Sequence, residues 1–526
     1  MTEHVWQAEI DELAYRKSLA AEMGGAERVG RQHEFGKLTI RERFDAFADP
    51  GSFEEVGGTA GLADYDDDGK LISFTPANFL VGVANVDGRP VVLSGDDFTV
   101  RGGSSELSIG AKRAFSEDIA LELALPHIRL VDGMGGGGSV KSMEKARRPL
   151  IPQAKGMDVI GAHLATAPSV SLALGSVAGI GAARVAMSHY SVIVEETAQM
   201  MIAGPALVEQ AGQPAVTKED LGHARVHTSN GAIDDAASSE AEAFAMAKRF
   251  LSYLPRNVHE LPARIEPCDD PSRRDDELAS IIPRNERQIY DVRKILDHVV
   301  DRNPDGESSF FEIGRSWGRS VVGGLARFDG WPVAIFTEDP KIYGGAWTAD
   351  GSQKLIRLLD LASTFHLPTV HLEDCPGFLI GKQAEDDATI RHGSRALVAL
   401  AQHKTPFASI VIRKAFGVAG AANRKPGSTH FRWSWPSGRW GSLPVQGGIE
   451  VAYKAELAEL NEEAVTARVA EIRQRLDQMS SPFLSAETFA IDDIIDPRET
   501  RPLLCNWANL VADARQPGQE SFTYRP

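Results

Sequence analysis

Cysteine is scarce in this chain of 526 residues, which contains only three. Cys268, Cys375 and Cys505 lie far apart and form no C-x-x-C pair. Neither a disulfide framework nor a zinc ribbon is therefore expected. So few thiols fit a reducing compartment, and we expect a cytoplasmic protein that holds no metal.

The chain also lacks an excess of positive charge, since its formal net charge is -17. A nucleic-acid-binding protein needs a basic surface that displaces counterions from phosphates. We therefore expect no nucleic-acid partner. Any anionic ligand must be held by local groups rather than by the overall field.

No secretory signal or membrane span is expected. The stretch from Met1 to Ile10 has no cationic region followed by an apolar run. The most apolar stretch, His163 to Met187, is rich in Ala and Gly and contains Pro168 and Arg184. That composition favours a buried strand and helix over a membrane-spanning helix.

What the chain does have is the composition of an ordinary globular protein, with 43% hydrophobic and 25% charged residues. Single hydrophobic cores stop growing at roughly 250 to 300 residues, so a chain of this length is expected to form two domains.

The two expected domains are related by an internal repeat. With an offset of 242 residues, Pro90 to Gly135 aligns without a gap on Pro332 to Gly377, and 13 of the 46 positions are identical. About three identities are expected from typical residue frequencies, so chance is a poor explanation. With an offset of 238 residues, Pro168 to Ala183 aligns on Pro406 to Ala421.

Each copy has the same order of predicted elements. A strand (Val91 to Leu93, or Val333 to Phe336) is followed by a Gly-Gly turn, a helix and a Pro-started strand that ends in Asp132 or Asp374. A second Pro-started strand (Val170 to Leu174, or Ala408 to Ile412) leads into a turn at Gly179 or Gly417 and another helix. Strands that alternate with helices indicate an α/β fold with a parallel sheet.

The Pro-rich stretch from Pro255 to Asp276 is the expected boundary. We therefore predict domains at 1–265 and 266–526. Helical structure is predicted from Glu12 to Phe47, with a break at Gly24-Gly25 and a capping box at Thr39 and Glu42. One long charged helix with a solvated face is predicted from Ile449 to Met479.

The turns at Gly179 and Gly417 lie where ligands bind in open parallel sheets, beyond the carboxyl ends of the strands. Backbone amides at a helix start favour negative charge, and glycine lets the backbone approach a ligand closely. The alternative is that each glycine only permits tight strand-to-helix packing. Equivalent glycines in both copies favour an oxyanion site.

The segments Gly175-Ser-Val-Ala-Gly-Ile-Gly181 and Arg413-Lys-Ala-Phe-Gly-Val-Ala419 resemble the paired oxyanion turns of the carboxyltransferase (β) subunit of biotin-dependent acyl-CoA carboxylases, the propionyl-, methylcrotonyl- and acetyl-CoA carboxylase family. The resemblance covers nearly the whole chain and includes Gly24-Gly25, Arg31-Gln-His33, Gly36-Lys-Leu-Thr-Ile-Arg-Glu-Arg43, Asp49-Pro-Gly-Ser-Phe53, Asp97-Phe98, Gly102-Gly-Ser-Ser105, Leu221-Gly222, Val226-His-Thr228, Pro376-Gly-Phe378 and Ile491-Asp-Asp-Ile-Ile-Asp-Pro-Arg-Glu-Thr-Arg501.

This resemblance implies a tandem crotonase-like (ClpP/crotonase) fold of two β-β-α spiral domains. It implies that the first domain takes the acyl-CoA, whose thioester oxygen would be held by the backbone amides of Gly179 and Ile180. The second domain would take carboxybiotin, whose ureido oxygen would be held by Val418 and Ala419. CO2 would move to the α (or vinylogous γ) carbon of the acyl-CoA through an enolate. The substrate-binding residues expected around these turns are Gly102, Gly103, Ser104, Gly135, Gly136, Gly137, Phe378, Gly417, Gly420 and Ala421.

The chain departs from the family pattern at three places. Ile180 and Val418 stand where the family commonly has a second glycine, and Gly420-Ala421 replace a Tyr-Asp pair of propionyl-type enzymes. The smaller, uncharged pair suggests a larger or more apolar acyl group. The run Gly135 to Ser139 is either a mobile loop or phosphate cradle at the mouth of the site, which we favour, or a flexible linker.

The sequence contains neither an Ala-Met-Lys-Met biotinylation motif nor a Gly-rich ATP loop. Biotin must then be carried on a partner chain, and ATP and Mg2+ must be used by a partner biotin carboxylase. The resemblance implies a homo-hexameric core with the partner α subunits attached, and active sites shared between copies.

Two other functions stay open at this point. A biotin-independent crotonase-type decarboxylase or hydrolase of acyl thioesters would use the same turns. A catalytically silent scaffold subunit would need neither of them.

Overall fold

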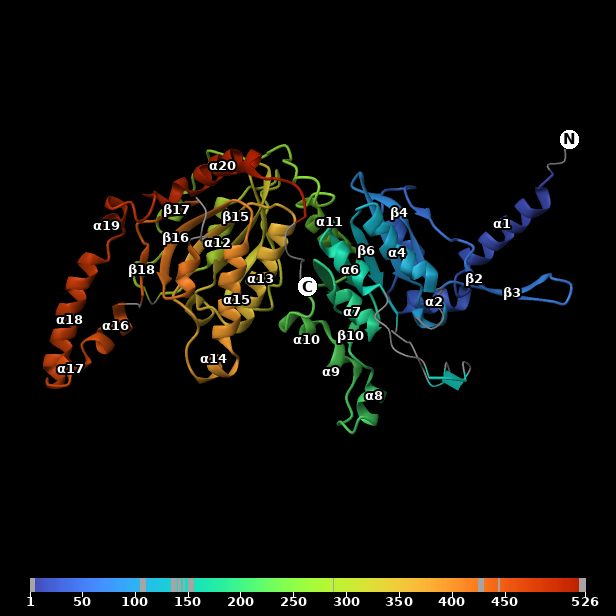
Figure 1. Ribbon diagram of the computed structural model, residues 1–526, viewed down its shortest axis with the longest axis horizontal. Helices are drawn as coiled ribbons and strands as arrows, with labels where there is room; N and C mark the ends of the chain where they lie inside the picture. Colours follow the sequence, from blue (N-terminus) through green and yellow to red (C-terminus); the bar gives the residue numbers. More distant parts are fainter. Residues whose placement is uncertain are drawn as a thin grey trace. The chain divides into compact units, whose positions relative to one another are not determined.

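The chain forms two compact units, which we call unit 1 and unit 2. Unit 1 comprises the residues up to Glu260 together with Gln519, and unit 2 comprises Leu261–Gly518. The computed structural model describes residues 5–104, 110–133, 140, 143–144, 147–149, 156–286, 288–423, 430–442 and 445–519. Each unit is built around its own sheet (Figure 1).

Unit 1 has a 7-stranded main sheet with the order β1-β4-β5-β6-β7-β9-β11. Neighbours from β5 to β11 are parallel, whereas β1, β4 and β5 pair antiparallel. The strands of unit 1 are β1 (Glu54–Glu55), β2 (Gly61–Tyr65), β3 (Leu71–Pro76), β4 (Phe79–Val86), β5 (Arg89–Asp96), β6 (His127–Val131), β7 (Ser169–Ala173), β8 (Ser176–Ala178), β9 (Tyr190–Val194), β10 (Gln199–Met201) and β11 (Asp235–Ala237). The sequence predicted the parallel part of this sheet but not its antiparallel edge.

Helices precede the sheet of unit 1 and connect its strands. They are α1 (Gln7–Ala21), α2 (Ala26–Glu34), α3 (Ile40–Phe47), η1 (Arg101–Gly103), α4 (Gly110–Glu122), α6 (Met157–Leu164), α7 (Ile180–Ala186), α8 (Pro205–Gln210), α9 (Lys218–Gly222), α10 (Ala224–Ser229) and α11 (Glu240–Ser252). The predicted capping box is confirmed, because Thr39 accepts from the Glu42 amide and Glu42 accepts from the Thr39 amide.

Unit 2 has an 8-stranded sheet with the order β12-β13-β14-β15-β16-β17-β19, in which β18 also pairs with β16. Its strands are β12 (Phe311–Glu312), β13 (Val321–Phe328), β14 (Trp331–Glu338), β15 (Thr369–Cys375), β16 (Phe407–Phe416), β17 (Phe431–Ser434), β18 (Arg439–Gly441) and β19 (Asp493–Ile494). As in unit 1, an antiparallel edge (β12 to β14) precedes parallel strands.

The helices α13 and α15 of unit 2 lie side by side in Figure 1 and pack together. The helices of this unit are η2 (Asp276–Ala279), α12 (Val292–Val299), η3 (Tyr343–Gly345), α13 (Ala349–Thr364), α14 (Lys382–Asp386), α15 (Thr389–Gln402), η4 (Ala419–Asn423), α16 (Val445–Ala452), α17 (Lys454–Leu457), α18 (Glu462–Met479), α19 (Pro482–Glu487), η5 (Pro497–Glu499), α20 (Thr500–Val511) and η6 (Ala512–Ala514).

The prediction of one long helix from Ile449 to Met479 is wrong. The segment is divided among α16, α17 and α18. The break before α18 has a local cause, because the side chain of Asn461 accepts a hydrogen bond from the Ala464 amide at 2.9 Å and so caps a new helix.

The register of the two sheets confirms the repeat. On the β6 side of unit 1, Ser94 pairs with Arg129, which pairs with Ser171. In unit 2, Phe336 pairs with His371, which pairs with Ser409. These are the positions that the offsets of 242 and 238 residues align. All parallel-strand residues from His127 to Val131 and from Thr369 to Cys375 are buried, as expected for strands covered on both faces.

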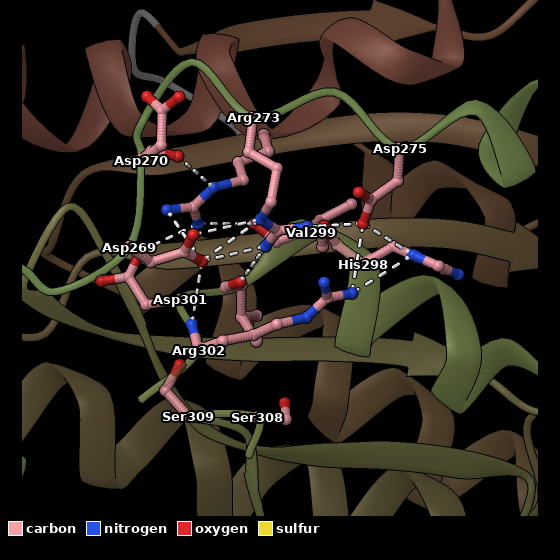
Figure 2. A network of polar contacts seen from close by, with 12 residues as sticks. Asp269, Asp270, Arg273, Asp275, His298, Val299, Asp301, Arg302, Ser308 and Ser309 are labelled. Atoms are coloured by element: carbon pink, nitrogen blue, oxygen red, sulfur yellow. Dashed lines mark hydrogen bonds and ion pairs between the residues drawn. The ribbon is translucent and has the colours of Figure 1, made fainter. Parts of the chain in front are cut away.

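A network of ion pairs attaches the start of unit 2 to its last long helix (Figure 2). Arg273 donates to Asp269 and to the carbonyl of Val300, and His298 contacts Asp275 at 2.7 Å. Arg501, at the start of α20, is buried and donates to Asp301 at 2.8 Å. The network therefore joins the segment after the domain boundary to α12 and α20.

Candidate active site

The first Gly turn, at Gly179, connects β8 to α7. Gly179 has φ 58° and ψ -122°, a conformation that only glycine adopts readily. An added Cβ would meet only the Ile202 carbonyl at 4.0 Å, so backbone conformation and not space requires the glycine. Ile180 follows it and is 45% exposed, so the start of α7 faces open space.

The second Gly turn, at Gly417, has the same construction. Gly417 has φ 64° and follows β16, and Val418 after it is 59% exposed. The Gly179 amide donates to the Met201 carbonyl at 3.1 Å, and the Gly417 amide donates to the Gly441 carbonyl at 3.0 Å. Each turn is thus held by a short parallel strand, β10 in unit 1 and β18 in unit 2.

These hydrogen bonds show which backbone amides of the two turns have no acceptor within the described protein. Within the part of the chain that the structure describes, the amides of Ile180 and Gly181 donate to no protein acceptor, and neither do those of Val418 and Ala419. Of the two donors expected at the first turn, Gly179 is therefore engaged by Met201 and Ile180 is available. The available pairs occupy matching positions in the repeat.

The Gly-Gly turns follow the carboxyl ends of β5 and β14, at the same edge of each sheet as the Gly179 and Gly417 turns. Gly102 (φ 65°) and Gly103 (φ 62°) form η1, and Gly344 (φ 65°) and Gly345 (φ 89°) form η3. A Cβ on Gly103 would lie 2.7 Å from the Asp132 carbonyl oxygen, and a Cβ on Gly345 would lie 2.7 Å from that of Asp374. The expected site residues Gly102 to Ser104 therefore pack against the end of β6.

Asp132, directly after β6, is a fully buried carboxylate held by the N-terminal segment. Lys37 donates to it at 2.8 Å, Arg43 at 2.9 Å and Gln32 at 3.1 Å. Arg43 also forms a buried pair with Glu240. Gly175 makes room for this cluster, because a Cβ there would lie 1.8 Å from Asp132 Oδ1.

Asp374 is the equivalent carboxylate in unit 2, but its partners differ. Arg413 donates to it at 2.8 Å and Tyr290 donates at 2.8 Å. Arg413 occupies the position of Gly175 in the repeat, so the strand itself provides the cation in unit 2. In unit 1 the cations come from residues before the sheet.

The two carboxylates consequently have opposite pKa shifts. Burial acts to raise the pKa of Asp132, but Arg43 and Lys37 outweigh it and hold that pKa below its ordinary value. Burial raises the pKa of Asp374, and the nearby cations Arg413 and Lys414 do not fully offset it.

The other expected site residues lie around the second turn or outside the described structure. Phe378 packs its ring 6.1 Å from that of Trp347, and Gly377 before it lies against the second turn. Ala421 is exposed, whereas Gly420 is buried, with no room for a Cβ because Ala415 would lie 2.6 Å away. Gly135, Gly136 and Gly137 lie outside the described residues.

Sequence reasoning missed the buried ion pairs beneath these turns. Lys37 and Arg43 belong to a motif that the sequence analysis noted, but their contact with Asp132 bridges 95 and 89 residues. A signal was present for another pair of residues, since the repeat aligns Arg129 with His371, two basic residues that each stand between two apolar residues.

Among the residues that the structure describes, no three His, Cys, Asp or Glu side chains are grouped to hold a metal. No helix in the described ranges is long and apolar enough to cross a membrane.

Comparison with known proteins places this arrangement in context. The model of the carboxyl transferase domain matches residues 31–520. The chain is 31% identical over 519 residues to the propionyl-CoA carboxylase carboxyltransferase subunit of Haloferax mediterranei, a match that covers 96% of this chain and 95% of the relative.

Solved structures agree with that match. The chain resembles the transcarboxylase 12S subunit, solved as a hexamer assembly with methylmalonyl-coenzyme A and methylmalonic acid bound, with a TM-score of 0.85 and 26% identity over 99% of this chain and 98% of that one. It also resembles a single-chain, multi-domain long-chain acyl-CoA carboxylase, with a TM-score of 0.77 and 26% identity, over 97% of this chain and 49% of that one. The fold is therefore crotonase-like, as expected from the sequence.

The different neutralisation of the two carboxylates leads to a stability prediction. We expect Asp132→Asn to lower the free energy of unfolding at pH 7 by roughly 3 to 5 kcal/mol, because it leaves buried Lys37 without its carboxylate and removes one of the two that pair with Arg43. Asp374→Asn should cost clearly less, because the pKa of Asp374 is raised and its charged form is already disfavoured. The contribution of Asp132 should be lost as the pH falls through its lowered pKa.

Urea unfolding followed by two signals measures both variants. Seven of the 8 tryptophans lie in unit 2, so tryptophan fluorescence follows that unit and far-UV circular dichroism follows both. Equal losses for the two variants at pH 7 would contradict the expectation.

Proposed function

Because the chain belongs to the carboxyl transferase domain family, and is a carboxyltransferase subunit of the propionyl-CoA carboxylase type, we propose that it moves a carboxyl group from carboxybiotin to an acyl-CoA between its two Gly turns. The observation that carries this assignment of roles is that the amides of Ile180-Gly181 and Val418-Ala419 donate to no acceptor within the described residues.

The first turn, in the acyl-CoA domain of residues 1–265, would hold the thioester oxygen. As the α-carbon becomes an enolate, negative charge develops on that oxygen, and preorganised N–H donors stabilise such charge without reorganising. The Ile180 amide is one donor. Since the Gly179 amide is engaged by Met201, we propose Gly181 as the second donor, with Gly179 shaping the turn.

The second turn, in the biotin domain of residues 266–526, would hold the ureido oxygen through the amides of Val418 and Ala419. These residues fit a ureido carbonyl, because they offer two adjacent donors beside an exposed apolar side chain. Carboxybiotin supplies the CO2 and, once CO2 has departed, a ureido nitrogen that can accept the α-proton. The chain therefore needs no side-chain base and acts by holding two oxygens.

Biotin and the ATP-dependent step belong to other chains in this proposal. We propose a biotin carboxylase, which uses ATP and Mg2+, and a biotin carrier as partners, and a homo-hexameric core of this subunit. The hexamer assembly of the transcarboxylase 12S subunit supports the last point. We also propose that the protein is cytoplasmic, as these partners are.

The second turn argues against a biotin-independent decarboxylase or hydrolase. Such an enzyme needs one oxyanion site for its thioester. Here the second turn keeps the positive φ of Gly417 and the hydrogen bond to a flanking strand. The Val418 and Ala419 amides also have no acceptor within the described residues.

The acyl group is proposed to be larger or more apolar than propionyl. Ala421 is exposed beside the second turn, where propionyl-type enzymes place an acidic residue. Gly420 packs on Ala415, so a tyrosine could not be accommodated there without moving β16. The similarity to a long-chain acyl-CoA carboxylase agrees with this size.

The function is tested by co-expressing the chain with a biotin carboxylase and a biotin carrier from neighbouring genes. We expect ATP-dependent fixation of labelled bicarbonate into one of acetyl-, propionyl-, butyryl-, octanoyl- or palmitoyl-CoA. Failure with every partner and thioester, together with biotin-free decarboxylation, would reverse the assignment.

The donor roles are tested by removing single amides. Proline is tolerated at the first position of a helix, so Ile180→Pro and Ala419→Pro delete one donor each. We expect each to lower kcat by roughly 100-fold to 1,000-fold, the cost of one oxyanion donor in other enzymes. Ile180→Ala and Val418→Ala keep their amides and serve as controls, which should retain most activity. Normal activity in both proline variants would contradict the donor roles.

The acyl-size proposal is tested by Ala421→Asp. A carboxylate at this exposed position should disfavour long apolar chains and shift the ratio of kcat/KM values toward short acyl groups. Competition between propionyl-CoA and octanoyl-CoA in one assay measures the ratio directly, and Ala421→Ser controls for size. An unchanged ratio would exclude Ala421 as a specificity residue.

A further inference from the structure

A buried basic side chain lies at the same repeat position in both units, three residues before Asp132 or Asp374. Arg129 is 2% exposed and His371 is fully buried. Both occur in strands whose other neighbours are mostly apolar. Each pairs with a carboxylate, which is Glu117 on α4 in unit 1 and Glu338 on β14 in unit 2.

The two ring nitrogens of His371 contact oxygens on two different elements. Nδ1 lies 3.4 Å from the Ala422 carbonyl oxygen, and Nε2 lies 3.0 and 3.2 Å from the two oxygens of Glu338. A carbonyl oxygen only accepts, so Nδ1 must be the donor there.

Glu338 is an acceptor as well. It accepts from Trp347 Nε1 at 3.0 Å and from the Asp374 amide at 3.0 Å, one donor on each oxygen. Burial acts to raise the pKa of Glu338, but His371 and the other donors outweigh it and hold that pKa low. Both nitrogens of His371 therefore face acceptor oxygens, one on the Ala422 carbonyl and the other on the Glu338 carboxylate.

The pair is electrically balanced by its surroundings. Glu373 is next but one to His371 in β15, and burial together with the nearby Glu338 raises its pKa well above the ordinary value. Burial therefore disfavours a second negative charge at Glu373, beside Glu338. The Phe336 ring stacks on His371 at 4.0 Å and fixes its plane.

In both units the basic side chain also contacts a backbone carbonyl in, or directly after, the helix that follows the Gly turn. His371 donates to Ala422 in η4, which begins at Ala419. Arg129 donates to the Met187 carbonyl at 3.1 Å, directly after α7, which begins at Ile180. Arg184 of α7 joins the same carboxylate, Glu117.

We propose that His371 is a positioning residue that fixes the second Gly turn by its hydrogen bond to the Ala422 carbonyl, as Arg129 fixes the first. η4 is a single short 3-10 segment, so its own hydrogen bonds do little to hold the Val418 and Ala419 amides in place. A hydrogen bond from a side chain on the buried strand β15 supplies that constraint. The inference rests on the proposed role of the second turn toward carboxybiotin.

Two substitutions separate this role from a contribution to stability alone. In His371→Asn, the amide nitrogen replaces Nδ1, so the bond to Ala422 is kept and the contact with Glu338 is lost. In His371→Gln, the amide nitrogen replaces Nε2, so the contact with Glu338 is kept and the bond to Ala422 is lost. Stability should follow the Glu338 contact, whereas the binding of biotin should follow the Ala422 contact.

The assay uses the full chain assembled with its carboxylase and carrier partners, with free biotin as carboxyl acceptor in the reverse direction. We expect His371→Gln to lower kcat/KM for free biotin roughly 10-fold to 100-fold, because the buried Ala422 carbonyl loses its donor. His371→Asn should stay within about threefold of the parent despite a lower melting temperature. The KM for the acyl-CoA should not change in either variant.

Other outcomes overturn the inference. If the two variants lose activity equally, or in the order of their melting temperatures, His371 acts only on stability. If neither variant folds, Glu338→Gln decides, because His371 can still donate to Ala422 and the KM for biotin should stay near the parent value. A parent enzyme that transfers no carboxyl group to biotin would instead refute the proposed function.

Discussion

A carboxylate that is cut off from water must be neutralised by the protein around it, and each unit of this chain is organised around one such group. Asp132 and Asp374 follow equivalent strands and are fully buried. They lie between the Gly-Gly turn, which packs on their carbonyl oxygens, and the strand that leads to the oxyanion turn. The positions of both turns therefore depend on how these two charges are satisfied.

The two units satisfy the same requirement with different residues. In unit 2 the cation is Arg413, within the strand itself, and in unit 1 that position is Gly175, which leaves room for Lys37 and Arg43. The pairs beneath the turns diverge in the same way, with Arg129 and Glu117 in one unit and His371 and Glu338 in the other. Duplication has kept the backbone and the requirement for a cation, while the residue that meets the requirement has changed.

Much of this arrangement was predictable from the sequence because it is local or repeated. The parallel strands, the capping box at Thr39 and the turns at Gly179 and Gly417 follow from periodicity, spacing and an alignment of the chain with itself. The antiparallel edges were missed, since β4 and β13 pair through turns that the repeat pattern did not include. The helix predicted from Ile449 to Met479 failed because one cap, at Asn461, outweighs the charge pattern.

The sequence predicted where the candidate site lies better than it predicted which groups act there. Two glycines indicated where oxyanions would be held, but only the hydrogen bond from Gly179 to Met201 identifies which amides are available. The pairing of the buried basic residues could not be inferred from spacing, because their carboxylates lie on other elements of the fold. Glu117 and Arg129 are 12 residues apart, and Glu338 and His371 are 33 apart.

The place in the chain of the cation that pairs with each buried carboxylate also bears on folding, because it sets the length of the loop that must close. Unit 2 closes its pair across 39 residues, from Asp374 to Arg413, within two adjacent strands. Unit 1 closes its pair across 95 residues, from Lys37 to Asp132, which lies directly after β6. Closing the longer loop costs more chain entropy. In both units one member of the pair, Lys37 or Asp374, is made first during synthesis from the N-terminus, and the pair of unit 1 has the longer loop to close.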